Sequence, residues 1–178
     1  DVTLIARGRH LEAMKEHGLT LERLWDPNPE TIAVKATDME HYKEQPDVIL
    51  VCVKGYSLED TVPFIRRVAK PDTIVIPILN IYGTGAKLQK ELPELLVTDG
   101  CIYVSANIKE PGVLVQHGKI LRIVYGVREK ADWRSELEEI RQDFADSAID
   151  GILSENIRRE ALEKFSYVSP IGAAGLYC

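Results

Sequence analysis

Short apolar runs rich in β-branched residues alternate along the chain with segments of helical periodicity. The runs at residues 2–6 (VTLIA), 48–53 (VILVCV) and 73–79 (TIVIPIL) predict strands, and the last two are continuous enough to be covered on both faces. Helices are predicted at residues 10–17, 86–92 and 133–144, with a further one after Ser57. This alternation is typical of a parallel, doubly wound α/β sheet.

Residues 101–125 follow a different pattern, in which β-like runs are separated by short connections. The runs lie at residues 102–108, 113–116 and 120–125, and they are joined by Pro111-Gly112 and His117-Gly118. Connections this short predict antiparallel strands, with His117 as a turn residue.

Two further stretches complete the pattern. Pro27 and Pro29 predict a loop within the less regular residues 19–34. A short last strand is predicted at residues 152–153, and a longer helix from Asn156 to the end of the chain. Because the sequence near this helix is apolar and small, we expect the helix to be mostly buried.

Composition narrows the class of protein. The chain of 178 residues is 45% hydrophobic and 28% charged, with a net charge of −6 and no basic tract, which argues against nucleic acid as a partner. No apolar run reaches the roughly 18 residues that cross a bilayer. The cysteines, Cys52, Cys101 and Cys178, are far apart. Their spacing argues against a zinc site and favours a reducing, cytoplasmic setting.

The end of the first predicted strand carries two cations and no acid, Arg7 and Arg9. In dinucleotide-binding sheets, an acid at the end of the second strand binds the ribose hydroxyls of NAD, whereas an arginine accommodates the 2′-phosphate of NADP. These arginines therefore indicate NADP if the strand is the second one. The alternative is a pair of solvated surface arginines.

Two further candidates follow the buried strands. Lys54 comes directly after residues 48–53, and Asn80 directly after residues 73–79. Ligands bind at the carboxyl edge of open α/β sheets, where a lysine can meet a phosphate or carboxylate and an asparagine a ketone oxygen. The alternatives are a lysine that faces water and an ordinary strand-to-helix turn.

Lys164 lies within the predicted C-terminal helix. A lysine held against apolar surface has a lowered pKa and can act as an acid near neutral pH. The alternative is a lysine on a solvated helix face. The histidines have no spacing that suggests a metal-ligand set, so we expect no metal.

Taken together, four segments resemble the ketopantoate reductase family. They are DVTLIARGRHLEAMKEHGLTL at the start, VILVCVKGYSLEDTVPFI, SANIKEPGVLVQHG and ENIRREALEKF. The resemblance implies a Rossmann-like, doubly wound parallel sheet with an added antiparallel strand region and the start of a C-terminal helical domain. It predicts an NADP-binding domain at residues 1–153, lacking its first strand and Gly-rich loop, and a truncated helical domain at residues 154–178.

The resemblance also implies an activity, the NADPH-dependent reduction of ketopantoate to pantoate in pantothenate biosynthesis, with a homodimer as the possible assembly. By matching positions, it implies that Lys164 is catalytic and that the cofactor contacts are Arg7, Lys54, Asn80 and Ala106. Asn80 and Lys164 are also expected to bind the 2-keto acid substrate. The chain by itself is expected to be inactive, because it lacks the loop that holds the pyrophosphate.

Two positions depart from the family pattern. Asn80 is followed by Ile81 where the family has glycine, and Val168 stands where the family has a substrate-binding asparagine. Two other functions therefore stay open. One is a related D-2-hydroxyacid dehydrogenase acting on another branched 2-keto acid, and the other is a non-catalytic nucleotide-binding module.

Overall fold

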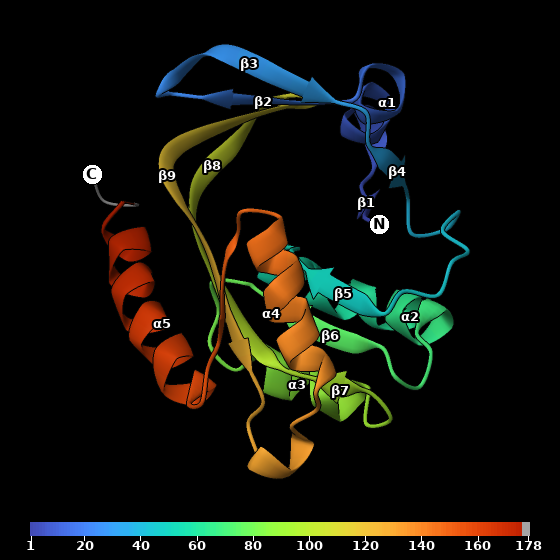
Figure 1. The fold of residues 1–178 in the computed structure, drawn as a ribbon, viewed down its shortest axis with the longest axis vertical. Helices are drawn as coiled ribbons and strands as arrows, with labels where there is room; N and C mark the ends of the chain where they lie inside the picture. Colours follow the sequence, from blue (N-terminus) through green and yellow to red (C-terminus); the bar gives the residue numbers. More distant parts are fainter. Residues whose placement is uncertain (176–178) are drawn as a thin grey trace. The chain divides into compact units, whose positions relative to one another are not determined.

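The computed structural model describes residues 1–175, which form an α/β fold of two compact units with mixed sheets. Unit 1 consists of Asp1–Glu44 and Val104–Ile120, and unit 2 consists of Gln45–Tyr103 and the chain from Leu121 onwards. Figure 1 labels their helices and strands in chain order. No helix in the described range is long and apolar enough to cross a membrane.

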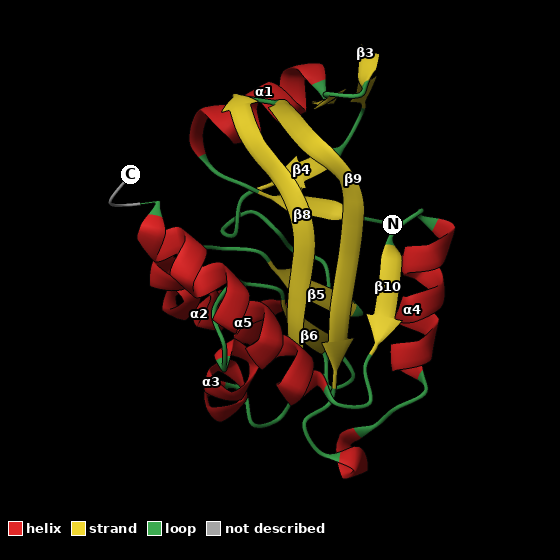
Figure 2. Cartoon of the chain, turned by 90° about the vertical axis from the view of Figure 1, so that its left-hand side faces the viewer, coloured by secondary structure: helices red, strands yellow, loops and turns green. Residues whose placement is uncertain are grey.

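Unit 1 contains the two-stranded sheet β1-β4 and part of the five-stranded sheet to which β2, β3, β8 and β9 belong. Its elements are β1 (Thr3–Ile5), α1 (Gly8–His17), β2 (Leu19–Arg23), β3 (Asp26–Ile32), β4 (Lys35–Thr37) and parts of the long strands β8 (Asp99–Glu110) and β9 (Val113–Gly126). Strand β1 pairs in parallel with β4, and β2 pairs in parallel with β9. Consecutive strands β8 and β9 run in opposite directions (Figure 2), as the sequence predicted.

The predicted loop within residues 19–34 is wrong, because this stretch forms the antiparallel hairpin β2–β3. Among the described strands, β3 pairs only with β2, and every residue of β3 is exposed. Pro27 and Pro29 lie opposite the place where the register shifts, between Leu21 and Arg23. An edge strand with an irregular register tolerates prolines, since their missing N–H donors are not needed there.

The predicted turn at His117-Gly118 is also wrong, because β9 continues through both residues. The Nε2 atom of His117 lies 2.5 Å from Oδ1 of Asn107 on β8, so a side-chain hydrogen bond joins the two strands at this point. The turn at Pro111-Gly112 is confirmed. Gly112 has a φ of +80°, and its N–H donates to Nδ1 of His10 over 3.0 Å.

Unit 2 contains a parallel sheet in the order β5-β6-β7. Its elements are β5 (Val48–Val51), η1 (Gly55–Ser57), α2 (Leu58–Val68), β6 (Ile74–Pro77), α3 (Thr84–Glu91), β7 (Leu96–Val97), η2 (Lys130–Asp132), α4 (Glu136–Asp146), β10 (Asp150–Leu153) and α5 (Ile157–Ala174). Strand β10 pairs in parallel with the end of β9.

Helices cover both faces of this sheet. One buried cluster joins Val75 of β6 to α2 and α3, and a second joins Ile74 and Ile76 of β6 to α4. Val75 and its two neighbours belong to different clusters because successive side chains of a strand point to opposite faces of the sheet. The central strand is therefore buried on both faces, as predicted, but the same prediction for β5 is wrong. Leu50 is 40% exposed, because β5 is a terminal strand of the three-stranded sheet.

Two glycines allow the chain to pass close to the carboxyl end of β6. A Cβ at Gly100 would lie 2.8 Å from the carbonyl oxygen of Pro77. A Cβ at Gly85, in α3, would overlap the carbonyl oxygen of Thr98 and Oδ1 of Asp99. The start of β8 can therefore approach both the end of β6 and helix α3 only because Gly100 and Gly85 have no side chains.

We predict that Gly85→Ala destabilises the protein by about 1–3 kcal/mol, because the backbone of Thr98 cannot move away from the added methyl group. Urea unfolding would measure the change. Gly118→Ala is the matched control, since an added Cβ there meets nothing within 4 Å, and its effect should stay within about 0.5 kcal/mol. Equal unfolding midpoints for the two variants would contradict the prediction.

Candidate functional site

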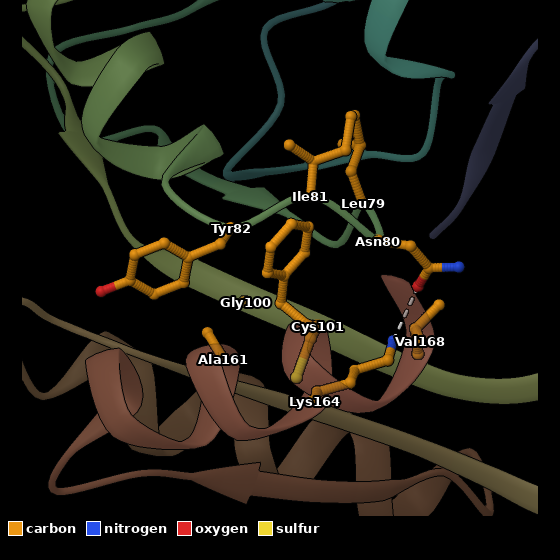
Figure 3. Close-up of a pocket in the computed structure, with 10 residues that line it drawn as sticks. Leu79, Asn80, Ile81, Tyr82, Gly100, Cys101, Ala161, Lys164 and Val168 are labelled. Atoms are coloured by element: carbon orange, nitrogen blue, oxygen red, sulfur yellow. Dashed lines mark hydrogen bonds between the residues drawn. The ribbon is translucent and has the colours of Figure 1, made fainter. Parts of the chain in front are cut away.

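Within unit 2, the structure brings together two residues that the sequence singled out separately. Nζ of Lys164 donates a hydrogen bond to Oδ1 of Asn80 over 2.8 Å, and it also donates to the carbonyl oxygen of Ile102. Figure 3 shows the lysine side chain reaching from α5 toward the asparagine. The two residues are 84 positions apart in the sequence.

Helix α5 is fixed at its first turn. The side chain of Asn156 caps the helix by accepting a hydrogen bond from the N–H of Arg159, and Ser154 donates to Glu160 over 2.6 Å. Ile157 is buried in a cluster with Cys101 of β8. Lys164 follows Ile157 by seven residues, which is two helical turns and therefore the same face. The anchored first turn thus directs Lys164 inward.

The expectation that this helix is mostly buried is wrong. Ile157 and Lys164 are the buried residues of α5, whereas Leu162, Tyr167 and Ile171 are at least 49% exposed. In the part of the chain that the structure describes, no element covers those apolar side chains. The apolar sequence of α5 was therefore not a reliable sign that the helix is buried within this chain.

Asn80 stands at the carboxyl edge of the parallel sheet. It follows the buried residues Ile78 and Leu79, and its own side chain is exposed. Val51 of β5 pairs with Pro77 of β6, so Lys54 and Asn80 each come three residues after a paired position. The expectation that both residues lie at one sheet edge is met by this register.

A mainly apolar pocket surrounds the Lys164–Asn80 contact. Its lining residues are Leu79, Asn80, Ile81, Tyr82, Gly100, Cys101, Ala161, Lys164, Phe165 and Val168. The rings of Tyr82 and Phe165 lie 6.4 Å apart, and Val168 is one helical turn beyond Lys164. Within the described range, no cluster of three or more His, Cys, Asp or Glu side chains could hold a metal ion.

Burial lowers the pKa of Lys164 below its usual value, while nearby Cys101 acts in the opposite direction. The side chain is only 7% exposed, so the ammonium has lost most of its hydration. A lysine with a lowered pKa releases its proton more readily than a solvated one. The site therefore holds a proton donor beside an amide that orients it.

The other predicted residues are not joined to this contact. Lys54 is exposed, and its side chain forms no hydrogen bond with Asn80 or Lys164. Arg7 and Ala106 are exposed residues of unit 1. Arg7 precedes the first turn of α1, which has no acidic residue, and no described residue forms an ion pair with its guanidinium.

Cys101 and Tyr103 are residues of the site that the sequence reasoning missed. Nζ of Lys164 lies 4.9 Å from the centre of the Tyr103 ring, and Cys101 lines the pocket. The sequence held one signal for them, since residues two apart on a strand share a face. Nothing in the sequence showed that this face of β8 meets α5.

Comparison with known proteins finds relatives of this chain. A family model described as ketopantoate reductase PanE/ApbA matches residues 1–130. The chain is 32% identical over 177 residues to the 2-dehydropantoate 2-reductase of Pyrococcus horikoshii, an alignment that covers 97% of this chain and 56% of the relative. The chain spans about half the length of the curated relatives it matches.

Solved structures share the fold. A 2-dehydropantoate 2-reductase from Porphyromonas gingivalis W83 superposes with a TM-score of 0.86 at 24% identity, over 99% of this chain and 61% of that one. A D-mandelate dehydrogenase solved with NADH and anilino(oxo)acetate superposes with a TM-score of 0.78 at 21% identity, over 90% of this chain and 51% of that one. Proteins of this fold thus include one that binds a nicotinamide nucleotide.

We predict that Lys164 makes the stability of the protein rise with pH in the alkaline range. Between the lowered pKa of the folded state and the ordinary value of 10.5, the unfolded chain binds more protons, so raising the pH favours folding. The free energy of unfolding of wild type relative to Lys164→Met should therefore increase from about pH 7 to about pH 10.

Urea unfolding of both proteins at the two pH values would measure this difference. Lys90→Met, which removes an exposed lysine, is the matched control for the loss of one positive charge. A difference between wild type and Lys164→Met that stays constant with pH would show that the lysine is not titrating as described.

Proposed function

The chain belongs to the ketopantoate reductase PanE/ApbA family, and on that basis we propose that its protein is an NADPH-dependent 2-keto acid reductase that converts ketopantoate to pantoate. The observation that carries the proposal is the hydrogen bond between buried Lys164 and Asn80 at the carboxyl edge of the sheet. It supplies a positioned proton donor where open α/β sheets bind ligands.

Lys164 acts on the oxygen of the ketone. NADPH, when bound, supplies a hydride to the ketone carbon, so negative charge develops on this oxygen. An ammonium has three N–H donors, and Asn80 and the Ile102 carbonyl accept two of them. The third donor is left for the substrate oxygen, which it stabilises and then protonates. Asn80 fixes the direction of that donor.

Residues of unit 1 suit the adenosine end of NADP. Arg7 follows parallel strand β1, its guanidinium has no ion-pair partner in the described range, and the adjacent helix turn carries no acid. An exposed, unpaired cation fits the charge of a 2′-phosphate. We assign Arg7 to this phosphate, Ala106 to the border of the cofactor, and Lys54 with Asn80 to its nicotinamide end.

The domain organisation is part of the same proposal. We assign residues 1–153 to an NADP-binding domain of the doubly wound Rossmann type, and the chain from residue 154, which includes α5 (Ile157–Ala174), to the start of a helical domain. Two observations support these bounds. Strand β10 ends at Leu153, and α5 exposes apolar side chains, as expected of a helix that packs against other helices.

A second candidate substrate is a branched 2-keto acid that lacks a hydroxyl group. Val168 and Ile81 line the pocket beside Lys164 with apolar surface. A hydroxyl buried against such surface without a partner is unfavourable. A related D-2-hydroxyacid dehydrogenase activity is therefore the alternative to ketopantoate reduction.

The test is NADPH oxidation by the full-length protein, with ketopantoate and with branched 2-keto acids that lack the hydroxyl. We predict that Lys164→Ala lowers kcat on the preferred substrate by roughly 10²–10⁴-fold, the range for loss of a positioned general acid. Lys90→Ala, an exposed control, should retain wild-type turnover. Turnover of Lys164→Ala within about threefold of wild type would remove Lys164 as the acid and leave Lys54 as the next candidate.

Cofactor choice gives a separate prediction. We expect the full-length protein to bind NADPH more tightly than NADH, and Arg7→Ala to weaken NADPH binding by about ten- to a hundredfold while leaving NADH unchanged, because a charge-assisted hydrogen bond to the 2′-phosphate is lost. Fluorescence titration of both nucleotides would measure this. Lys15→Ala removes the same charge from the other end of α1 and serves as the control. Equal affinities of wild type for the two nucleotides would refute the assignment.

A further inference from the structure

The ammonium of Lys164 has a third neighbour besides its two oxygen acceptors. Its Nζ lies 4.9 Å from the centre of the Tyr103 ring. A cation within about 6 Å of an aromatic face is attracted by the negative charge of that face, and the attraction grows when water is excluded. Lys164 is only 7% exposed and Tyr103 is 36% exposed, so water is excluded from the lysine side of this contact.

The Tyr103 ring lies on the same face of β8 as Cys101, because the two residues occupy alternate positions of the strand. Burial raises the pKa of Tyr103, with Cys101 acting in the same direction, so the phenol stays neutral. It therefore acts on Lys164 through the ring face and not through a charge.

We propose that Tyr103 is a positioning residue for Lys164. The ring of Tyr103 keeps the buried ammonium of Lys164 protonated and in place until the ketone oxygen takes its proton. This inference rests on the proposed function of Lys164. Two effects oppose one another at the lysine. Loss of hydration favours the neutral amine, whereas the ring and the two oxygen acceptors favour the cation.

Few other titratable groups act on this cluster. They are Cys101 of β8, Glu160 of α5, which acts on Cys101 and Tyr103, and Arg122 of β9, which acts on Tyr103. No carboxylate is hydrogen-bonded to Lys164 among the described residues. In the absence of a carboxylate partner, the Tyr103 ring and nearby Cys101 are the side chains beyond Asn80 that can stabilise the charge.

The test uses three forms of the full-length protein: wild type, Tyr103→Leu, which removes the ring, and Tyr103→Phe, which keeps it. The titration of Lys164 is followed by labelling with an amine-reactive anhydride over a range of pH and quantifying the Lys164 peptide by mass spectrometry. We expect Tyr103→Leu to lower the apparent pKa of Lys164 by about 0.4–1.5 units, and Tyr103→Phe to lower it by less than about 0.3 unit.

The high-pH limb of kcat/KM should move to lower pH by the same amount in Tyr103→Leu, because a general acid must be protonated to act. Tyr167→Leu, which removes an exposed ring from α5, is the control for labelling and should leave the titration unchanged. A merely structural role for Tyr103 would change the unfolding temperature without moving either titration.

The labelling does not depend on turnover, so the two proposals fail separately. If no keto acid is reduced but the titration shifts only in Tyr103→Leu, the proposed function fails and the role of the ring stands. Identical titrations in all three forms, or equal shifts in both variants, would overturn the role of Tyr103. If Tyr103→Leu does not fold, Tyr103→Trp should raise the pKa of Lys164, and an unchanged value there would overturn it equally.

Discussion

A lysine ammonium that leaves water must find replacements for the hydrogen bonds that it loses, because a buried and uncompensated charge is strongly unfavourable. Lys164 finds them in Asn80 and the carbonyl of Ile102, which lie 84 and 62 residues away in the sequence. Those partners belong to the loop after β6 and to the start of β8, so α5 can bury its lysine only once both segments are in place. The contacts that form the candidate site are therefore the same contacts that allow α5 to pack with Lys164 buried.

A second polar network holds the start of β8 where Lys164 needs it. Arg128 donates to the carbonyl oxygen of Val97 over 2.8 Å and to Oε1 of Gln89 over 3.2 Å, and it lies 3.4 Å from Asp99. The Arg128 and Asp99 side chains are 11% and 9% exposed, so solvent screens this pair little. Because Asp99 is the first residue of β8, the network fixes the strand next to Gly100, whose missing side chain admits β6.

Local features of this structure followed from the sequence, and contacts between distant segments did not. The parallel strands could be predicted from continuous apolar runs, and the edge position of Asn80 followed from where its strand ends. That Lys164 reaches Asn80 could not be derived, since the spacing of residues says nothing of which helix packs at a sheet edge. The errors at Pro27 and His117 have a related cause. Both were interpreted from local preference, whereas an irregular edge pairing and a cross-strand hydrogen bond decided the outcome. The role of Arg7 stays a prediction.

The irregular hairpin β2–β3 also bears on how copies of this protein behave at high concentration. A long, flat edge strand offers a row of unpaired N–H and C=O groups on which a strand of another molecule can add. Strand β3 interrupts that row with Pro27 and Pro29, with its shifted register, and with the charges of Asp26 and Glu30. Intermolecular strand addition, and the aggregation that follows from it, is therefore disfavoured at this fully exposed strand, without any contribution from the residues of the candidate site.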